Sequence, residues 1–432
     1  MNRYKTYKDS GIPWLGEVPE HWETWKITHT IDLIGSGTTP KSDNAEYYDG
    51  DVLWVTTSEL RENFISDTKQ KVSDRAIKDY SALKIYPVNS VAMAMYGATI
   101  GRLGILEKEA TFNQACCVFG VSKILYYKFL FYWLWHRRPI LISLSNGGGQ
   151  PNLSQDDLKK LKLPIPSYKE QIFIAHYLDT KLGEIDALIG KQQTLLEKLA
   201  EQRTAVITHA VTKGLNPAAP MKNSGVEWLG DVPAHWEMKA IKRVVKEHAG
   251  NGFPIELQGN NGDVPFLKVS DLNKGGKLLE DFANSVTRNI IYEMKWNIVP
   301  KFSLVTAKIG EALKKNHRKI ISQDSIIDNN CIAFECLGIN LDYHYYLSLI
   351  IDFDWFENGG TVPSLSVQKY KNQKICIPSL EEQTAIAEYL DQETAKIDRL
   401  CDTVNQTIGR LKEYRTALIT QAVTGKIKVT DE

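Results

Sequence analysis

Apolar residues recur at alternating steps of four and three positions in two long stretches of the chain, 166–214 and 378–426. A repeat of this kind predicts a coiled-coil helix in each stretch, because one stripe of the helix then faces a partner helix. About 45 residues form a rod of roughly 65 to 70 Å, whose apolar seam must be covered. We expect the two helices to cover each other. The seam residues are Leu178, Leu182, Ile185, Ile189, Leu196, Leu199 and Val206 in the first helix, and Leu390, Ile397, Val404, Ile408, Leu411 and Leu418 in the second.

The starts of both helices share the pattern Pro-Ser-x-x-Glu, which places Glu170 and Glu382 in the first turn. This pattern predicts a capping box, in which the serine oxygen and the glutamate carboxylate each accept a hydrogen bond from a free backbone amide. Polar residues interrupt the seam further along, at Gln192, Arg203 and Arg415. These breaks either set the register between the helices or face another molecule.

A duplicated domain precedes each helix. Residues 10–23 read Ser-Gly-Ile-Pro-Trp-Leu-Gly-Glu-Val-Pro-Glu-His-Trp-Glu, and residues 224–237 read Ser-Gly-Val-Glu-Trp-Leu-Gly-Asp-Val-Pro-Ala-His-Trp-Glu. We expect the tryptophans of these segments to pack into hydrophobic pockets, because large aromatic side chains serve packing more often than chemistry. The chain then divides into a domain at 1–165, a helix at 166–213, a domain at 214–378 and a helix at 379–432.

Within the two domains, short apolar runs alternate with glycine turns and polar loops, which predicts the α+β class with few helices per domain. The stretch Tyr126–Trp135 is the most apolar run and is predicted to be a buried helix. The helices match closely between the two copies whereas the loops after the strands do not, which suggests a shared mechanical role beside two different targets. The matching segments are 50–60 and 262–272, 88–97 and 300–310, 113–119 and 329–334, and the glycine loops 147–154 and 359–366.

Composition narrows the class of protein. The chain holds 52 lysines and arginines against 52 aspartates and glutamates, and 43% of its residues are hydrophobic, as is common in globular proteins. It shows no apolar run of membrane-spanning length and no export signal, so we expect a cytoplasmic protein whose six cysteines are reduced. DNA-binding domains often carry a basic excess, which is absent here, so DNA contacts must rest on local patches or on a more basic partner.

Motifs for catalysis are missing from the sequence. There is no phosphate-binding Gly-x-x-x-x-Gly-Lys-Ser/Thr loop, no Cys-x-x-Cys pair and no His/Glu pair with zinc spacing. The only Asn-Pro pair, at 216–217, lacks the aromatic residue of a base-methylating motif. We therefore expect neither an enzyme nor a metal site in this chain.

Three motifs together resemble the specificity (S) subunits of type I restriction-modification systems, the HsdS family, and the resemblance covers essentially the whole chain. The first is the pair of Trp-Leu-Gly-x-Val-Pro-x-His-Trp openings. The second is the strand and turn Met-Tyr-Gly-Ala-Thr-Ile-Gly-Arg at 95–102, whose second copy at 307–314 keeps the glycine but lacks Ile-Gly-Arg. The third is the helix start Pro-x-x-x-Glu-Gln-x-x-Ile-Ala-x-Tyr-Leu-Asp, present at 166–179 and 378–391.

The resemblance implies two target-recognition domains, each reading one half of an asymmetric bipartite site in double-stranded DNA. It implies that the two long helices form an antiparallel coiled coil with pseudo-two-fold symmetry that sets the spacer between the half-sites. It also implies assembly with two modification subunits, which bind S-adenosylmethionine and methylate adenine N6, and with two restriction subunits, which use ATP and magnesium. The S subunit carries no cofactor and no chemistry of its own in this family.

Candidate DNA contacts are polar side chains on loops at strand ends, because such side chains can reach base edges and phosphates. For the run 314–319 we expect phosphate contact, since adjacent charges rarely all point into a groove. The candidates are Thr38, Thr39, Lys41, Thr56, Thr57, Ser58, Arg61, Tyr96 and Arg102 in the first domain, and Lys268, Ser270, Asn273, Lys274, Lys308, Lys314, Lys315 and Arg318 in the second. For the coiled coil and partner docking they are Gln171, Tyr177, Leu178, Ile185, Leu196, Leu199, Gln383, Tyr389, Leu390, Ile397, Ile408 and Leu411.

Two other hypotheses remain open. A protein-only scaffold, in which the coiled coil joins two interaction domains, agrees with the neutral charge, and salt-dependent DNA binding would separate it from a DNA-reading subunit. A self-sufficient nuclease or methyltransferase would need a catalytic motif that the sequence does not contain.

Overall fold

The computed structural model describes residues 3–143 and 152–429. The chain forms two compact units, one of Met1–Gln192 with Asn405–Glu432 and the other of Gln193–Val404. Each unit holds one α+β domain together with one end of each long helix. The first glycine loop, expected at 147–149, lies outside the described residues. In the part of the chain that is described, no helix is both long and apolar enough to cross a membrane.

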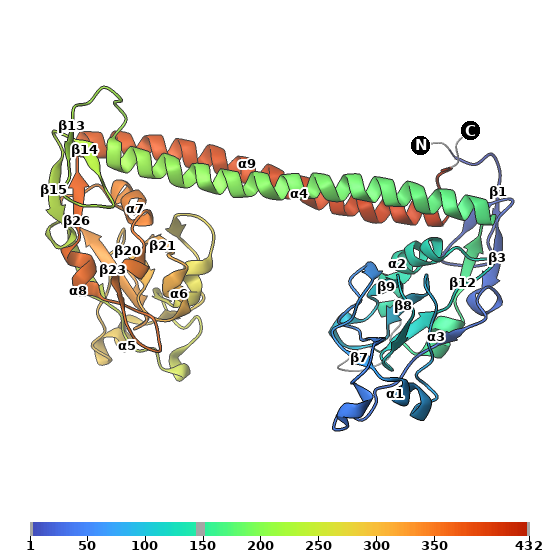
Figure 1. The fold of residues 1–432 in the computed structure, drawn as a ribbon. Helices are drawn as coiled ribbons and strands as arrows, with labels where there is room; N and C mark the ends of the chain where they lie inside the picture. The colour runs from blue at the N-terminus through green and yellow to red at the C-terminus, as the bar shows by residue number, and fades with distance from the viewer. Residues whose placement is uncertain (1–2, 144–151, 430–432) are drawn as a thin grey trace. The chain divides into compact units, whose positions relative to one another are not determined.

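The domain of unit 1, drawn in blue to teal in Figure 1, contains two sheets. Buried side chains of both sheets belong to one core. The larger, mixed sheet has the order β4-β11-β8-β9-β6, with β4 Ile34–Gly35, β11 Cys116–Phe119, β8 Val91–Ala94, β9 Leu103–Leu106 and β6 Asn63–Ile65. The smaller sheet has the order β10-β5-β7, with β10 Ala110–Phe112, β5 Val52–Val55 and β7 Lys71–Val72. The remaining elements are the pairs β1 Tyr7–Asp9 with β2 Glu17–Pro19 and β3 Glu23–Lys26 with β12 Lys162–Ile165, and the helices α1 Asp74–Asp79, α2 Tyr127–Ser143 and α3 Gln155–Lys159.

The domain of unit 2 repeats this topology. Its larger sheet has the order β16-β23-β20-β21-β18, with β16 Val245–Ala249, β23 Cys331–Cys336, β20 Leu304–Ala307, β21 Arg318–Ile321 and β18 Leu278–Leu279. Its smaller sheet has the order β19-β17-β22, with β19 Ser285–Val286, β17 Val264–Leu267 and β22 Ile326–Ile327. The paired strands are β13 Met221–Asn223 with β14 Asp231–Pro233, β15 Glu237–Ala240 with β26 Lys374–Ile377, and β24 Glu357–Asn358 with β25 Ser364–Leu365; the helices are α5 Arg288–Glu293, α6 Glu311–Lys314, α7 Leu341–Leu349 and α8 Val367–Asn372.

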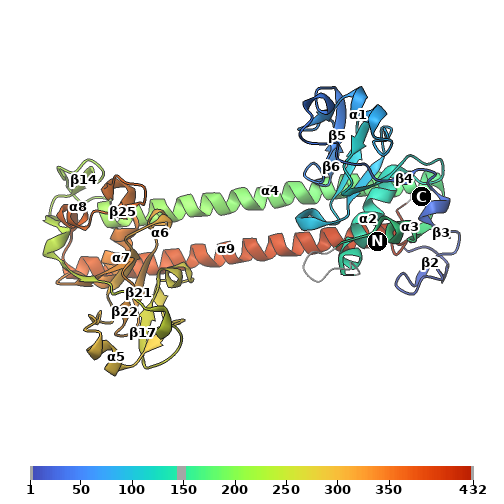
Figure 2. The ribbon, with the colours of Figure 1, turned by 90° about the horizontal axis from the view of Figure 1, so that it is seen from below.

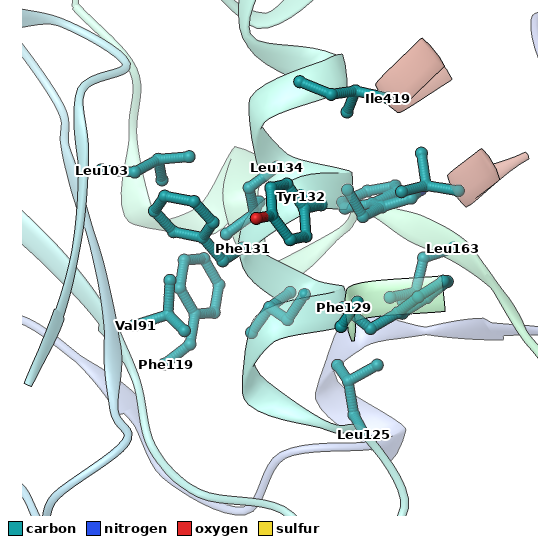
Figure 3. Packing of buried hydrophobic residues seen from close by; sticks show 14 of the residues in the cluster. Val91, Leu103, Phe119, Leu125, Phe129, Phe131, Tyr132, Leu134, Leu163 and Ile419 are labelled. Atoms are coloured by element: carbon teal, nitrogen blue, oxygen red, sulfur yellow. The ribbon is translucent and has the colours of Figure 1, made fainter. Parts of the chain in front are cut away.

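Helix α2 forms the centre of the unit 1 core. It is apolar around most of its circumference, as a buried helix must be, which confirms the expectation for Tyr126–Trp135. Figure 3 shows Phe129 and Phe131 of α2 packed among side chains of the same cluster, which also includes Val91, Phe119 and, from the last long helix, Ile419. The sheet, α2 and the coiled coil of this unit therefore share one hydrophobic core.

The two long helices are α4 Tyr168–Lys213 and α9 Leu380–Val423, and in each unit they run antiparallel (Figure 2). In unit 1 the start of α4, with Leu178 and Ile185, shares a core with Leu418 near the end of α9. In unit 2 the end of α4, with Ile207, shares a core with Leu390 near the start of α9. The antiparallel pair of long helices is thus confirmed, and its seam is apolar in both units.

The arginines that interrupt the seam are paired between the helices. Arg415 Nη2 lies 3.4 Å from a carboxylate oxygen of Asp186 in unit 1, and Arg203 Nη1 donates a short hydrogen bond to Asp398 in unit 2. Each arginine is half-buried and meets an aspartate on the opposite helix. For Arg203 and Arg415, the structure therefore supports the first of the two roles left open by the sequence, which is to set the register.

Candidate nucleic-acid interface

A buried glutamate joins the start of α4 to the Trp-Leu-Gly segment of domain 1. The Glu170 carboxylate accepts hydrogen bonds from Trp22 Nε1 at 3.1 Å and from the Tyr4 hydroxyl at 2.6 Å, and it lies 3.0 Å from His21 Nε2. Burial and the carboxylate raise the pKa of Tyr4 far above its usual value, so the hydroxyl remains a donor. The spacing of His and Trp in the motif, which occurs twice in the chain, therefore serves attachment of the helix.

The expected capping box is only half correct. Ser167 Oγ accepts a hydrogen bond from the Glu170 amide at 3.3 Å, as predicted, but the Glu170 carboxylate binds the Trp-Leu-Gly segment. The indole N–H of Trp22 and the hydroxyl of Tyr4 are donors beside this carboxylate. A buried donor without an acceptor costs more free energy than a backbone amide that water can reach. The same arrangement recurs in unit 2, where Glu382 accepts from Trp236 Nε1 at 3.0 Å and lies 2.9 Å from His235 Nε2.

The glutamine that follows each of these glutamates is buried, and this corrects its expected role in partner docking. Gln171 accepts a hydrogen bond from the Tyr126 amide at 2.7 Å and donates to the Pro166 carbonyl at 3.0 Å. Gln383 accepts from the Asn340 amide at 2.7 Å and donates to the carbonyl before its helix at 2.9 Å. The side-chain amides of Gln171 and Gln383 therefore bind the start of each helix to its own domain. The expectation that they contact a partner was wrong.

An aspartate further along each helix provides a second attachment. Asp179 accepts from the Tyr132 hydroxyl and from Lys128 Nζ, each at 2.5 Å. In unit 2, Asp391 accepts from the Tyr346 hydroxyl at 2.6 Å and from Lys277 Nζ at 2.7 Å. The repeated Tyr-Leu-Asp motif signalled these aspartates, but their partners on the domains could not be read from the sequence.

Four chain segments of unit 1 meet at the strand ends of domain 1, and we call them the first strand-end cluster: 37–39, 95–97, 113–115 and 152–153. The Gly37 amide donates to the Asn113 carbonyl at 3.3 Å, the Met95 amide to Ala115 at 2.8 Å, and the Leu153 amide to Met95 at 2.7 Å. Glycine is required at 37, because a Cβ there would lie 1.5 Å from the Phe112 carbonyl oxygen.

The first strand-end cluster brings together three of the expected DNA contacts, Thr38, Thr39 and Tyr96. It also exposes Gln114, which is not among the expected contacts although it follows Asn113 in the matching segment 113–119. Thr39 Oγ1 donates to Gln114 Oε1 at 2.6 Å, so the two side chains form one polar surface.

The other expected contacts of domain 1 lie on separate loops. The Thr56 and Ser58 hydroxyls both bond to the Glu59 carboxylate, and Arg61 Nε donates to the Ser58 carbonyl at 3.0 Å. Several polar groups of the loop 56–61 therefore form hydrogen bonds within the loop itself. Thr57 is half-buried on this loop, Lys41 is exposed after the first cluster, and Arg102 is half-buried after the glycine turn.

The second strand-end cluster consists of residues 250–251, 308–310, 328–330 and 363–365 of unit 2. The Asn251 amide donates to Ile327 at 2.8 Å, the Lys308 amide to Asn330 at 2.8 Å and the Leu365 amide to Lys308 at 2.8 Å. It presents the expected Lys308 together with the exposed Asn329. Two of these backbone connections match the first cluster, because Lys308 has the bonding partners that Met95 has there, whereas Asn251 bonds to a residue one position earlier than Gly37 does.

The remaining candidates of unit 2 gather on the loop after β17. Lys268 Nζ donates to Gln258 Oε1 at 3.1 Å, and Lys274 Nζ lies 2.9 Å from the buried carboxylate of Asp271. Ser270 and Asn273 are exposed on this loop, and Asn273 Oδ1 accepts from Lys315 Nζ at 3.2 Å. Lys315 and its exposed neighbour Lys314 thus lie beside the loop.

Arg318 does not belong to this surface, and its expected DNA contact is wrong. Its side chain is 2% exposed, its Nη2 donates to the Ile351 carbonyl at 3.1 Å, and its guanidinium carbon lies 3.5 Å from the Phe353 ring centroid. Burial lowers the pKa of Arg318 to about 10. Strand β21 is buried at all four of its positions, so membership of a basic run did not predict exposure for Arg318.

These features agree with the comparisons with known proteins. The model of the type I restriction modification DNA specificity domain matches residues 19–198 and 233–409. The chain belongs to this family. It is a DNA-specificity subunit, and catalysis is the work of other subunits of such systems. Within residues 3–143 and 152–429, no group of three or more His, Cys, Asp or Glu side chains is placed to hold a metal ion.

Relatives of this family member match nearly its full length. The MjaIX specificity subunit of Methanocaldococcus jannaschii is 27% identical over 96% of both chains, and the EcoKI specificity subunit of Escherichia coli K12 is 22% identical over 95% of this chain and 90% of that one. Among solved structures, the HsdS subunit from Thermoanaerobacter tengcongensis has a TM-score of 0.56 at 15% identity, and a chain from a type I assembly has 0.74 at 14%. Both cover 94% of this chain and are themselves covered over 98%.

Proposed function

We propose that each strand-end cluster reads one half of a bipartite site in double-stranded DNA. The observation that carries this proposal is the contrast within the duplication: matching backbone connections place Met95 and the exposed Gln114 in one cluster where the other has Lys308 and the exposed Asn329. A backbone frame shared by two domains, with different exposed polar side chains, suits a protein that applies one recognition geometry to two sequences. The half-sites are then unlike, and the whole site is asymmetric.

The long helices have two parts in this proposal. They set the number of base pairs between the half-sites, since α4 and α9 both continue from one unit into the other. They also dock two modification subunits, which use S-adenosylmethionine to methylate adenine N6, and two restriction subunits join the complex and use ATP.

Exposed apolar residues on the helices support the docking surface. Leu188 in unit 1 and Leu400 in unit 2 occupy the same place in the duplicated helices and are 45% and 53% exposed. Leu188 follows Asp179 by nine residues, which at about 100° per residue places it on the side of α4 opposite the domain attachment. Tyr177 and Tyr389 lie eleven residues before the two leucines, and therefore within about 20° of the same face. One kind of partner can therefore meet the same pair of side chains twice.

We expect Leu188→Lys to weaken the docking of one modification subunit and Leu400→Lys to weaken that of the other, each by roughly 10-fold or more, because a charge would be desolvated in an apolar contact. The mass of the complex is measured as modification subunit is added. For each single variant it should level off at the value for one bound copy. Ala187→Lys, on the next residue of α4, is the matched control and should still bind two copies. Two bound copies in both leucine variants would contradict this docking surface.

DNA binding by the complex of the chain with its modification subunits tests the proposed function. Counterion release predicts that affinity falls steeply as salt rises. The double variant Lys314→Ala with Lys315→Ala should lower the slope of log affinity against log salt by about one to two, if both lysines meet phosphates. Binding that is absent at low salt would favour the protein-only scaffold, and an unchanged slope would remove these lysines from the interface.

A further inference from the structure

The contact between Thr39 and Gln114 places an exposed amide in a defined orientation. Thr39 belongs to the loop after β4 and Gln114 to the turn between β10 and β11, and the hydroxyl donates to Oε1 at 2.6 Å. The turn itself is held by the Asn113 side chain, whose Oδ1 accepts from the Ala115 amide at 3.1 Å. Both ends of the Gln114 side chain are thereby restrained before any ligand arrives.

The hydrogen-bonding groups that remain on Gln114 match one base. Its carbonyl oxygen has two acceptor sites, of which Thr39 occupies one, and its NH2 group has two donors. Within residues 3–143 and 152–429, no hydrogen bond engages that NH2 group. One acceptor beside one donor is the pattern complementary to adenine in the major groove, where N6 donates and N7 accepts. Guanine offers two acceptors at that edge and would leave the second acceptor site of the Gln114 oxygen unfilled.

We propose that Gln114 reads an adenine in the half-site of the first domain and that Thr39 is the positioning residue for its amide. This inference rests on the proposed function and adds to it the identity of one base and of its reader. Gln114 Nε2 donates to adenine N7 while Oε1 accepts from adenine N6, and the hydrogen bond from the Thr39 hydroxyl restrains the position of the amide.

The second cluster lacks this arrangement. Asn329 stands at the position of Gln114, since the preceding Asp328 accepts from the Asn330 amide at 2.7 Å just as Asn113 accepts from Ala115. Its side chain is one methylene shorter, and the cluster contributes Lys308 beside it. The Thr39–Gln114 pair belongs to domain 1, and its loss should leave the other half-site unchanged.

The test selects bound duplexes from a randomised DNA pool with the complex of the full chain and its modification subunits, and compares base preferences at every position. Gln114→Ala should lower the preference for adenine roughly 10- to 100-fold at one position of one half-site and leave the other half-site intact. Thr39→Val should cause a smaller loss at the same position. The control, Gln70→Ala, removes an exposed amide elsewhere in domain 1 and should change nothing.

A second measurement replaces the adenine at that position with 7-deaza-adenine, which lacks the N7 acceptor. The substitution should weaken binding by the unaltered protein but add little to the defect of Gln114→Ala. Wild-type preferences in Gln114→Ala, or a loss at a position that is not adenine, would overturn the assignment of Gln114. Selection of no two-part motif by the unaltered complex would instead overturn the proposed function itself.

Discussion

Replacing Glu170 with alanine is expected to destabilise unit 1 by about 3 kcal/mol, because it leaves buried donors without an acceptor. Trp22 is fully buried, its indole N–H points at the carboxylate, and the Tyr4 hydroxyl shares the same oxygen. Glu170→Gln keeps one acceptor oxygen and should cost less. Hydrogen exchange of peptides that cover 10–23 and the start of α4, compared between the variants, measures this local loss.

Glu382→Ala provides the matched control within the same chain. The Glu382 side chain is 27% exposed against 7% for Glu170, and its position lacks the tyrosine donor. Water can therefore replace part of the lost bonding, and we expect about 1 to 2 kcal/mol. Equal destabilisation by the two variants would contradict the account of Glu170 as a buried acceptor for Trp22 and Tyr4.

Arg318→Ala is expected to destabilise unit 2 by about 2 to 4 kcal/mol, since it removes a buried side chain together with its hydrogen bonds and its stacking on Phe353. Arg318→Met fills most of the same space without a charge and should cost less than alanine. Urea denaturation gives both free energies. DNA binding by the folded variants should keep the salt dependence of the unaltered protein, because the guanidinium does not reach the surface.

The contrast with Lys315 makes this prediction specific. Lys315→Ala should reduce the salt slope without a loss of stability, as befits an exposed lysine. A lower salt slope with unchanged stability in Arg318→Met would show that Arg318 contacts DNA after all.

Much of the fold could be predicted from the sequence because the duplication repeats each signal twice. The period of Leu178, Ile185, Leu390 and Ile397 predicts two packed helices, and each of these side chains is buried in the structure. The role of Arg415 could not be predicted, because its aspartate partner is more than two hundred residues away in sequence.

The candidate site was harder to predict, because burial decides which polar residues are available. Arg318 and Lys314 belong to one basic run, yet Arg318 lies in the core on strand β21, whereas Lys314 ends helix α6 and is exposed. Gln171 was expected to contact a partner, but its amide oxygen accepts a hydrogen bond from Tyr126 within its own unit. Gln114 was missed because only the fold brings its turn beside the loop of Thr39.

Mapping of methylated adenines in a host genome tests the central claim most directly. The complex is supplied either with the unaltered chain or with a chain whose domain 1, residues 1–165, is replaced by the equivalent domain of another family member. We predict a two-part motif in both cases, with one half exchanged and the other half and the spacer retained. A motif that stays the same, or one in which both halves change, would contradict the assignment of one half-site to each domain.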